Sequence, residues 1–163
     1  MKIELRNVKY AAFASQETSC FEATVYLDDA KAGTVRNDGH GGCNLYHPHE
    51  LGQRLQAYAA TLPEEASEFL EDNGKPMMIQ PDADIVIGDV LSAYMASRDL
   101  QRLLKTKIVF AKGGKILGTK KIPAPQLALL LTKPEEVRTR YGAEALLNTM
   151  PFDEALALYR KCA

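Results

Sequence analysis

The stretch from Arg36 to Glu50 limits most strongly how this chain can fold, because it combines clustered glycines with all three histidines of the protein. Its Asn-Asp-Gly-His-Gly-Gly segment, residues 37–42, allows positive φ angles and close approach of another group to the backbone. Pro48 suits the first turn of a helix. The sequence therefore predicts an ordered loop that follows a strand, lies against a helix N-terminus and presents at least one histidine to a concavity.

Three kinds of ligand chemistry fit this loop. A divalent metal is a possible cofactor, with His40 and either His47 or His49 as the preferred ligands. The wider set of ligand-type side chains in the stretch is Asp38, His40, Cys43, His47 and His49.

An anion is the second option, because glycine-rich amides before a helix favour a phosphate or nucleotide. The amides concerned belong to Asn37, Asp38, Gly39, His40, Gly41 and Gly42. Neither common phosphate-binding fingerprint occurs.

Catalysis is the third option, with His40 as general base and Asp38 as the group that orients it. The structural alternative is that His47 or His49 caps a helix while His40 hydrogen-bonds within the loop.

The hydrophobic pattern predicts an α+β fold. Residues 2–15, with a bulge near Asn7, 18–27 and 32–36 form an N-terminal antiparallel three-stranded meander, and Gly113-Gly114 marks a second β-hairpin between residues 107–111 and 115–122. Several helices pack with these strands. They are expected at residues 49–61, 63–72, 82–105, 126–132, 134–141, 143–148 and 152–161.

Bulk properties indicate one domain spanning residues 1–163, since 163 residues with 46% hydrophobic content can bury an ordinary core. We expect a cytoplasmic protein, because neither a membrane span nor a secretory leader is recognised. The three cysteines are far apart and fit reduced thiols better than a disulfide framework. The sequence leaves the oligomeric state open.

The net charge of −1 hides two blocks of opposite sign. Residues 63–89 carry eight acidic residues against Lys75 alone, whereas residues 100–134 contain no acid and eight lysines or arginines. Such a separation creates local fields, although charge runs are also common on surfaces that only face solvent. Lysines of the predicted hairpin could bind an acidic partner or, through phosphates, nucleic acid. The candidates are Lys112, Lys115, Lys120 and Lys121.

The segment from Lys9 to Gly42, which ends in the Asn-Asp-Gly-His-Gly-Gly loop, resembles a group of small uncharacterised proteins of bacteriophages and other bacterial mobile elements. This resemblance implies an accessory role in a host cell, for which counteracting a defence system such as CRISPR is one option. It assigns no catalytic residues. We therefore expect a protein that binds a host protein or nucleoprotein. The alternative is an enzyme acting on a nucleotide or phosphorylated substrate at the loop.

Overall fold

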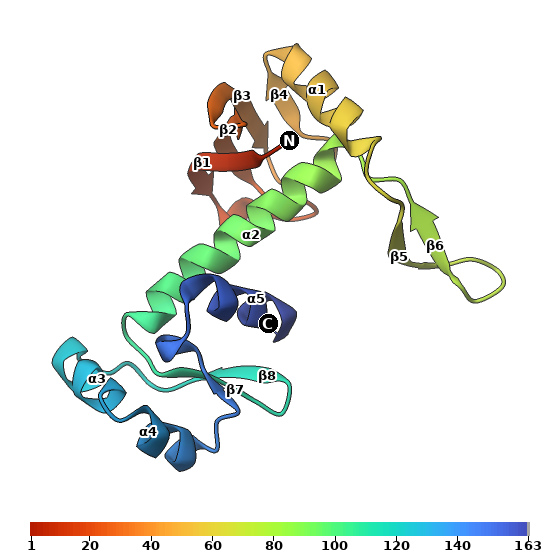
Figure 1. The fold of residues 1–163 in the computed structure, drawn as a ribbon. Helices are drawn as coiled ribbons and strands as arrows, with labels where there is room; N and C mark the ends of the chain where they lie inside the picture. The colour runs from red at the N-terminus through yellow and green to blue at the C-terminus, as the bar shows by residue number, and fades with distance from the viewer. Residues whose placement is uncertain (163) are drawn as a thin grey trace. The chain divides into compact units, whose positions relative to one another are not determined.

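The computed structural model describes residues 1–162, apart from the side chain of Glu68. Helices and antiparallel sheets both occur, so the predicted α+β class is confirmed (Figure 1). The chain divides into two compact units, Met1–Ser92 (unit 1) and Ala93–Ala163 (unit 2). The single domain expected from the sequence stays a prediction.

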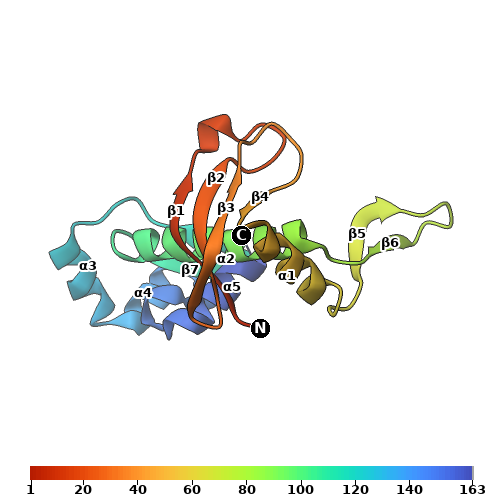
Figure 2. The same cartoon turned by 90° about the horizontal axis from the view of Figure 1, so that it is seen from above.

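Unit 1 contains a four-stranded antiparallel sheet with the strand order β1-β2-β3-β4 (Figure 2). The predicted three-strand meander is present. A short fourth strand, which the sequence analysis missed, pairs with the third and extends the sheet. The strands are β1 (Ile3–Tyr10), β2 (Phe21–Leu27), β3 (Ala30–Asn37) and β4 (Leu45–His47).

Alternation and turn chemistry explain this sheet. Every second residue of β2 is buried, from Phe21 to Leu27, which places one face of the strand in the core. Asp28 and Asp29 both have positive φ angles, as a tight two-residue hairpin turn requires. The predicted bulge is confirmed, because the register shifts between Arg6 and Lys9 and Asn7 has φ 54°.

Two helices complete the core of unit 1. Helix α1 (His49–Ala59) buries Leu51 and Leu55 on one face, and α2 (Ala83–Leu104) begins in unit 1 and ends in unit 2. The Asp82 carboxylate accepts the Ile85 amide at 2.8 Å and so caps α2, as its sequence predicts.

The prediction of an acidic helix at residues 63–72 is wrong. These residues instead form β5 (Glu65–Leu70), which pairs with β6 (Pro76–Ile79). Asn73-Gly74 does not cap a helix but turns the hairpin, with Gly74 at φ 77° and its amide bonded to the Glu71 carbonyl. A short helix without a packing partner gains little stability, whereas the Asn-Gly turn favours a hairpin directly.

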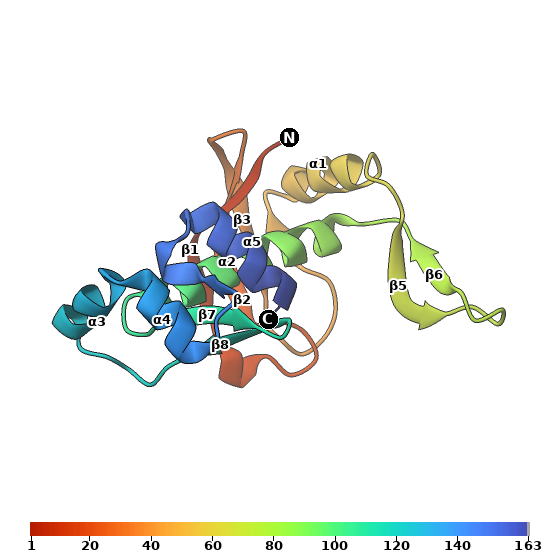
Figure 3. The ribbon, with the colours of Figure 1, turned by 60° about the horizontal axis from the view of Figure 1, so that its bottom comes forward.

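Unit 2 contains the predicted glycine hairpin, β7 (Val109–Lys112) and β8 (Lys115–Gly118), with α3 (Ala124–Leu131), α4 (Pro134–Tyr141) and α5 (Phe152–Cys162) (Figure 3). The prediction of a helix at residues 143–148 is wrong. This segment instead forms β9 (Ala145–Leu146), which pairs with β7, followed by a single 3-10 turn. Leu146 and Leu147 reach the core from this extended segment, so burial overrides helix propensity there.

Two apolar clusters hold unit 2 together. One joins Leu100, Val109, Leu147 and Ala155, and the other joins Ile108, Phe110, Leu127, Val137 and Leu146. Within the described residues, none of the helices has the length and apolar character needed to cross a membrane.

Candidate protein-binding site

The glycine-rich loop is organised by the side chain of Asn37, the polar residue buried at the end of β3. Its Oδ1 accepts the Thr18 hydroxyl at 2.7 Å and the Gly39 amide at 2.9 Å. Its Nδ2 donates to the Gly42 carbonyl at 3.2 Å and to Asn44 Oδ1 at 3.1 Å. The Asn37 side chain therefore links the glycine-rich loop that follows it to Thr18, which lies apart from that loop in the sequence.

Gly39 explains why this loop needs glycine. It has φ 87°, and a Cβ built there would collide with the carbonyl oxygen of Ala14. The Gly39 carbonyl accepts the amides of Gln16, Glu17 and Thr18 at 3.0 to 3.4 Å. The loop is thus packed on residues 14–18, and not on the N-terminus of α1 as the sequence analysis expected.

Asp38 and His40 lie on the exposed side of this loop. Asp38 Oδ1 accepts the His40 amide at 3.2 Å, while His40 Nδ1 lies 3.4 Å from Gln16 Oε1. The carboxylate therefore bonds the His40 backbone and does not orient its ring. The remaining loop residues, Gly41 and Gly42, have φ angles of 91° and 90°.

The histidines face different surroundings. His47 lies in a hollow lined by Glu22, Thr34 and Arg36, whereas His49 lines a groove on α1. Within residues 1–162, no three His, Cys, Asp or Glu side chains gather as a metal site would require. His47 and His49 therefore line two different cavities, of about 530 and 850 Å³.

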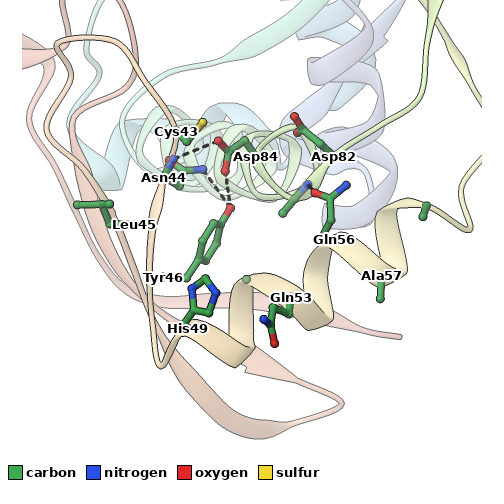
Figure 4. Close-up of a pocket in the computed structure, with 13 residues that line it drawn as sticks. Cys43, Asn44, Leu45, Tyr46, His49, Gln53, Gln56, Ala57, Asp82 and Asp84 are labelled. Atoms are coloured by element: carbon green, nitrogen blue, oxygen red, sulfur yellow. Dashed lines mark hydrogen bonds between the residues drawn. The ribbon is translucent and has the colours of Figure 1, made fainter.

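That groove, which we call the β4–α1 groove, has a volume of about 850 Å³ and lies within unit 1 (Figure 4). It is bounded by β4 with the two residues before it, by α1, and by the start of α2. Figure 4 shows Cys43, Asp82 and Asp84 toward one end and His49 with Gln53 toward the other. Its lining is completed by Asn44, Leu45, Tyr46, Gly52, Gln56, Ala57, Ala60 and Ala83.

Asp84 is the fixed polar group of the groove. Its Oδ1 accepts the Tyr46 hydroxyl at 2.6 Å, and its Oδ2 accepts the Asn44 amide at 3.1 Å. Burial and then the hydrogen bond to Asp84 raise the pKa of the Tyr46 hydroxyl. A tyrosine that resists ionisation serves poorly as a base or nucleophile, so this pair holds the start of α2 to β4.

Gly52 lets the Tyr46 side chain approach α1 closely. A Cβ at Gly52 would stand 3.0 Å from Tyr46 Cδ2, closer than ordinary packing allows. At the far side, Gln56 Oε1 accepts the Ala83 amide at 3.0 Å. These contacts fix the two walls of the groove relative to each other.

The hairpin β5–β6 is the second unusual surface of unit 1. Phe69, Leu70, Met77 and Met78 are 71%, 64%, 44% and 50% exposed. Figures 1 and 3 show the two strands as a ribbon that neither α1 nor the four-stranded sheet covers. The base of the hairpin is hydrogen-bonded to the end of α1 and the turn after it. Gln80 Nε2 donates to the carbonyls of Ala59 and Leu62 at 2.9 and 3.0 Å.

The predicted lysines all lie exposed in unit 2 but do not form one patch on the hairpin. Lys112 and Lys115 are a cross-strand pair at the glycine turn. Lys120 and Lys121 follow the opposite end of β8, outside the strand. Lys112 is also partly engaged, since its Nζ donates to the Tyr141 carbonyl at 3.1 Å.

Sequence reasoning missed Tyr46, Asp84 and the exposed hairpin. Asn73-Gly74 between two short apolar runs was the available signal for the hairpin. No local signal pairs Tyr46 with Asp84, which lie 38 residues apart. Comparison with protein-family models, curated proteins and solved structures finds no match.

Proposed function

We propose that this protein acts by binding a partner protein, with the hairpin β5–β6 as its main contact surface. The observation that carries the proposal is the exposure of Phe69 (71%) and Met78 (50%) on a two-stranded sheet with no covering layer. A lone two-stranded hairpin is only marginally stable in water, so a partner that covers it would stabilise it. Exposed apolar patches with polar rims mark interaction sites, and aromatic and methionine side chains are enriched there.

The charges around the hairpin define the partner's chemistry. Glu64, Glu65, Glu71 and Asp72 are exposed on or beside it, against Lys75 as the single basic residue of segment 63–80. Charge complementarity therefore favours a partner surface with an apolar centre and a lysine- or arginine-rich rim. Rim charges of this kind speed association and select among partners.

A host protein or nucleoprotein is the partner we propose, in an accessory role of the mobile-element type. Unit 1 has 15 acidic and 7 basic residues, whereas unit 2 has 13 basic and 6 acidic residues. A nucleoprotein offers both a basic protein surface for unit 1 and phosphates for unit 2. Interference with a defence system such as CRISPR is one role that binding of this kind would serve.

The enzyme alternative at residues 37–42 lacks such support. The hydrogen bonds of Asn37 and the contact of Gly39 with residues 14–18 account for the loop without a ligand. His40 is bonded to Gln16 and not to a nucleophile in the described residues. The enzyme alternative stays a prediction from the sequence.

The test is capture from bacterial lysate by the tagged protein, with quantification of each captured species. Phe69→Ser and Met78→Ser should lower recovery of the specific partner by about tenfold or more, the size of effect expected at a binding hot spot. Phe13→Ser is the matched control, because Phe13 is also in unit 1 and is 93% exposed.

The control should retain the partner. A species recovered equally by wild type and both hairpin variants is not bound through β5–β6, and recovery of nothing but such species would contradict the proposal. Circular dichroism of each variant checks that the fold is unchanged.

A further inference from the structure

We infer that the β4–α1 groove binds a short basic segment of the partner's chain. This inference rests on the proposed protein-binding function, and it adds a second site with its own chemistry. At about 850 Å³ the groove is as large as ordinary ligand pockets and larger than one side chain needs. It therefore has room for a few residues of an extended peptide.

The walls of the groove suit the stem of a long side chain. Ala57, Ala60 and Ala83 contribute small apolar groups, and the ring of Tyr46 adds a flat surface fixed against Gly52. Lysine and arginine bury their methylene stems along such surfaces while the charged group reaches a polar end.

The charged end of the groove favours a cation. Asp82 and Asp84 both line it, and within the described residues no lysine or arginine does. Tyr46 and Asn44 already hold both oxygens of Asp84 in place, so this carboxylate needs no rearrangement when a ligand arrives. Asp82 uses Oδ1 for the Ile85 amide, and its second oxygen makes no hydrogen bond within the described residues.

The groove and the hairpin follow each other along the chain. Ala60 of the groove lies just before the hairpin segment, and Asp82 lies just after it. Gln80 fixes the base of the hairpin to the end of α1, which forms one wall of the groove. One partner with an apolar patch and a neighbouring basic segment could therefore engage both sites.

Titration of isotope-labelled full-length protein by nuclear magnetic resonance tests the inference. The probes are acetyl-Ala-Leu-Arg-Ala-Leu-amide and the same peptide with Glu in place of Arg. The arginine peptide should shift the amide signals of Gly52, Gln53, Ala57 and Ala83, and the glutamate peptide should not. Free arginine amide should bind more weakly than the peptide, because it lacks the apolar neighbours; equal binding would identify a small-molecule cation site and overturn the peptide assignment.

A charge variant sharpens the test. Gln53→Lys places a cation in the groove and should weaken peptide binding by about tenfold through like-charge repulsion. Gln101→Lys, an exposed glutamine in unit 2, is the matched control and should leave it unchanged. Shifts spread over the whole surface, or equal binding by Gln53→Lys, would overturn the inference.

The two proposals can fail separately. Phe69→Ser should keep peptide binding in the groove while it loses the captured partner. If Gln53→Lys captures the partner as well as wild type does, the groove is not part of the interface although the hairpin still is. If peptide binding is normal but Phe69→Ser retains the partner, the hairpin proposal fails alone.

Discussion

Unit 1 and unit 2 use the same structural device, an asparagine side chain that hydrogen-bonds groups from more than one part of its unit. Asn37 makes four hydrogen bonds in unit 1. Asn148 makes three in unit 2, where it accepts the Val109 amide at 2.7 Å and donates to the carbonyls of Leu104 and Lys107 at 3.3 and 2.9 Å. An amide can accept and donate at once, so it satisfies loop groups that sheet pairing leaves free.

The surfaces of the two units differ strongly. Unit 1 has a formal net charge of −8 and unit 2 of +7, which nearly cancel in the whole chain. The two units thus combine similar internal hydrogen bonding with opposite net charges. The following predictions separate the internal device from the surfaces.

Removal of the Asn37 amide should have the largest effect. Asn37→Ala leaves polar groups of Thr18, Gly39, Gly42 and Asn44 without their partner, which should lower the free energy of unfolding by about 2 to 4 kcal/mol. Denaturant titration measures this loss, and hydrogen exchange should show it in unit 1 amides first. Asn73→Ala, in the exposed hairpin turn, is the control; equal losses from both variants would show that Asn37 has no special role.

Asn148→Ala should cost less, about 1 to 3 kcal/mol, because three bonds are lost and the residue is only half-buried. Faster exchange should be centred on Val109 and its strand. If unit 1 amides lose protection to the same extent, the two units do not unfold independently and the comparison between them fails.

Tyr46→Phe should cost about 1 to 2 kcal/mol at neutral pH, because an oxygen of Asp84 loses its donor. It should also change the response to alkali. The raised pKa of Tyr46 means that above pH about 10 the unfolded chain releases this proton while the folded protein keeps it. The unfolded state then binds fewer protons, so the free energy of unfolding falls as pH rises. Melting temperatures between about pH 9 and 11 should decline less steeply in Tyr46→Phe than in wild type. An identical slope would contradict this assignment.

Charge reversal on unit 2 should have the smallest effect on stability. Replacing Lys112 and Lys115 by Glu should change the free energy of unfolding by no more than about 0.5 kcal/mol per residue, since both are exposed. If unit 2 contacts duplex DNA through this pair, the slope of log affinity against log salt should fall by about 0.9 per lost phosphate contact. The same replacement of Lys120 and Lys121, at the other end of β8, is the matched comparison. If neither double variant changes the slope, these lysines do not contact DNA and only face solvent.

Much of the fold followed from local sequence signals. Alternation in residues 21–27, the Gly113-Gly114 turn and the Asp82 cap each act over a few residues, so the meander, the second hairpin and α2 were predicted correctly. The errors at residues 63–72 and 143–148 occurred where turn chemistry or burial of Leu146 outweighed helical periodicity.

The candidate site was less predictable, because it depends on contacts between distant residues. The hydrogen bonds between Tyr46 and Asp84 and between Thr18 and Asn37 form only after the chain has folded. The glycine density of residues 37–42 was interpreted as a ligand loop, which stays a prediction. Close packing of Gly39 on Ala14 accounts for glycine at that position, and the positive φ angles of Gly41 and Gly42 favour glycine at theirs.

The two strands of the hairpin β5–β6 each have one unpaired edge, and this has a consequence for the protein in storage and in concentrated solution. Unpaired edges with apolar side chains tend to join between molecules into larger sheets and aggregates. Carboxylates at Glu65 and Glu71 oppose this joining by repulsion between copies. High salt would weaken that repulsion by screening it, so the same acidic side chains that surround the apolar surface also oppose aggregation of this protein.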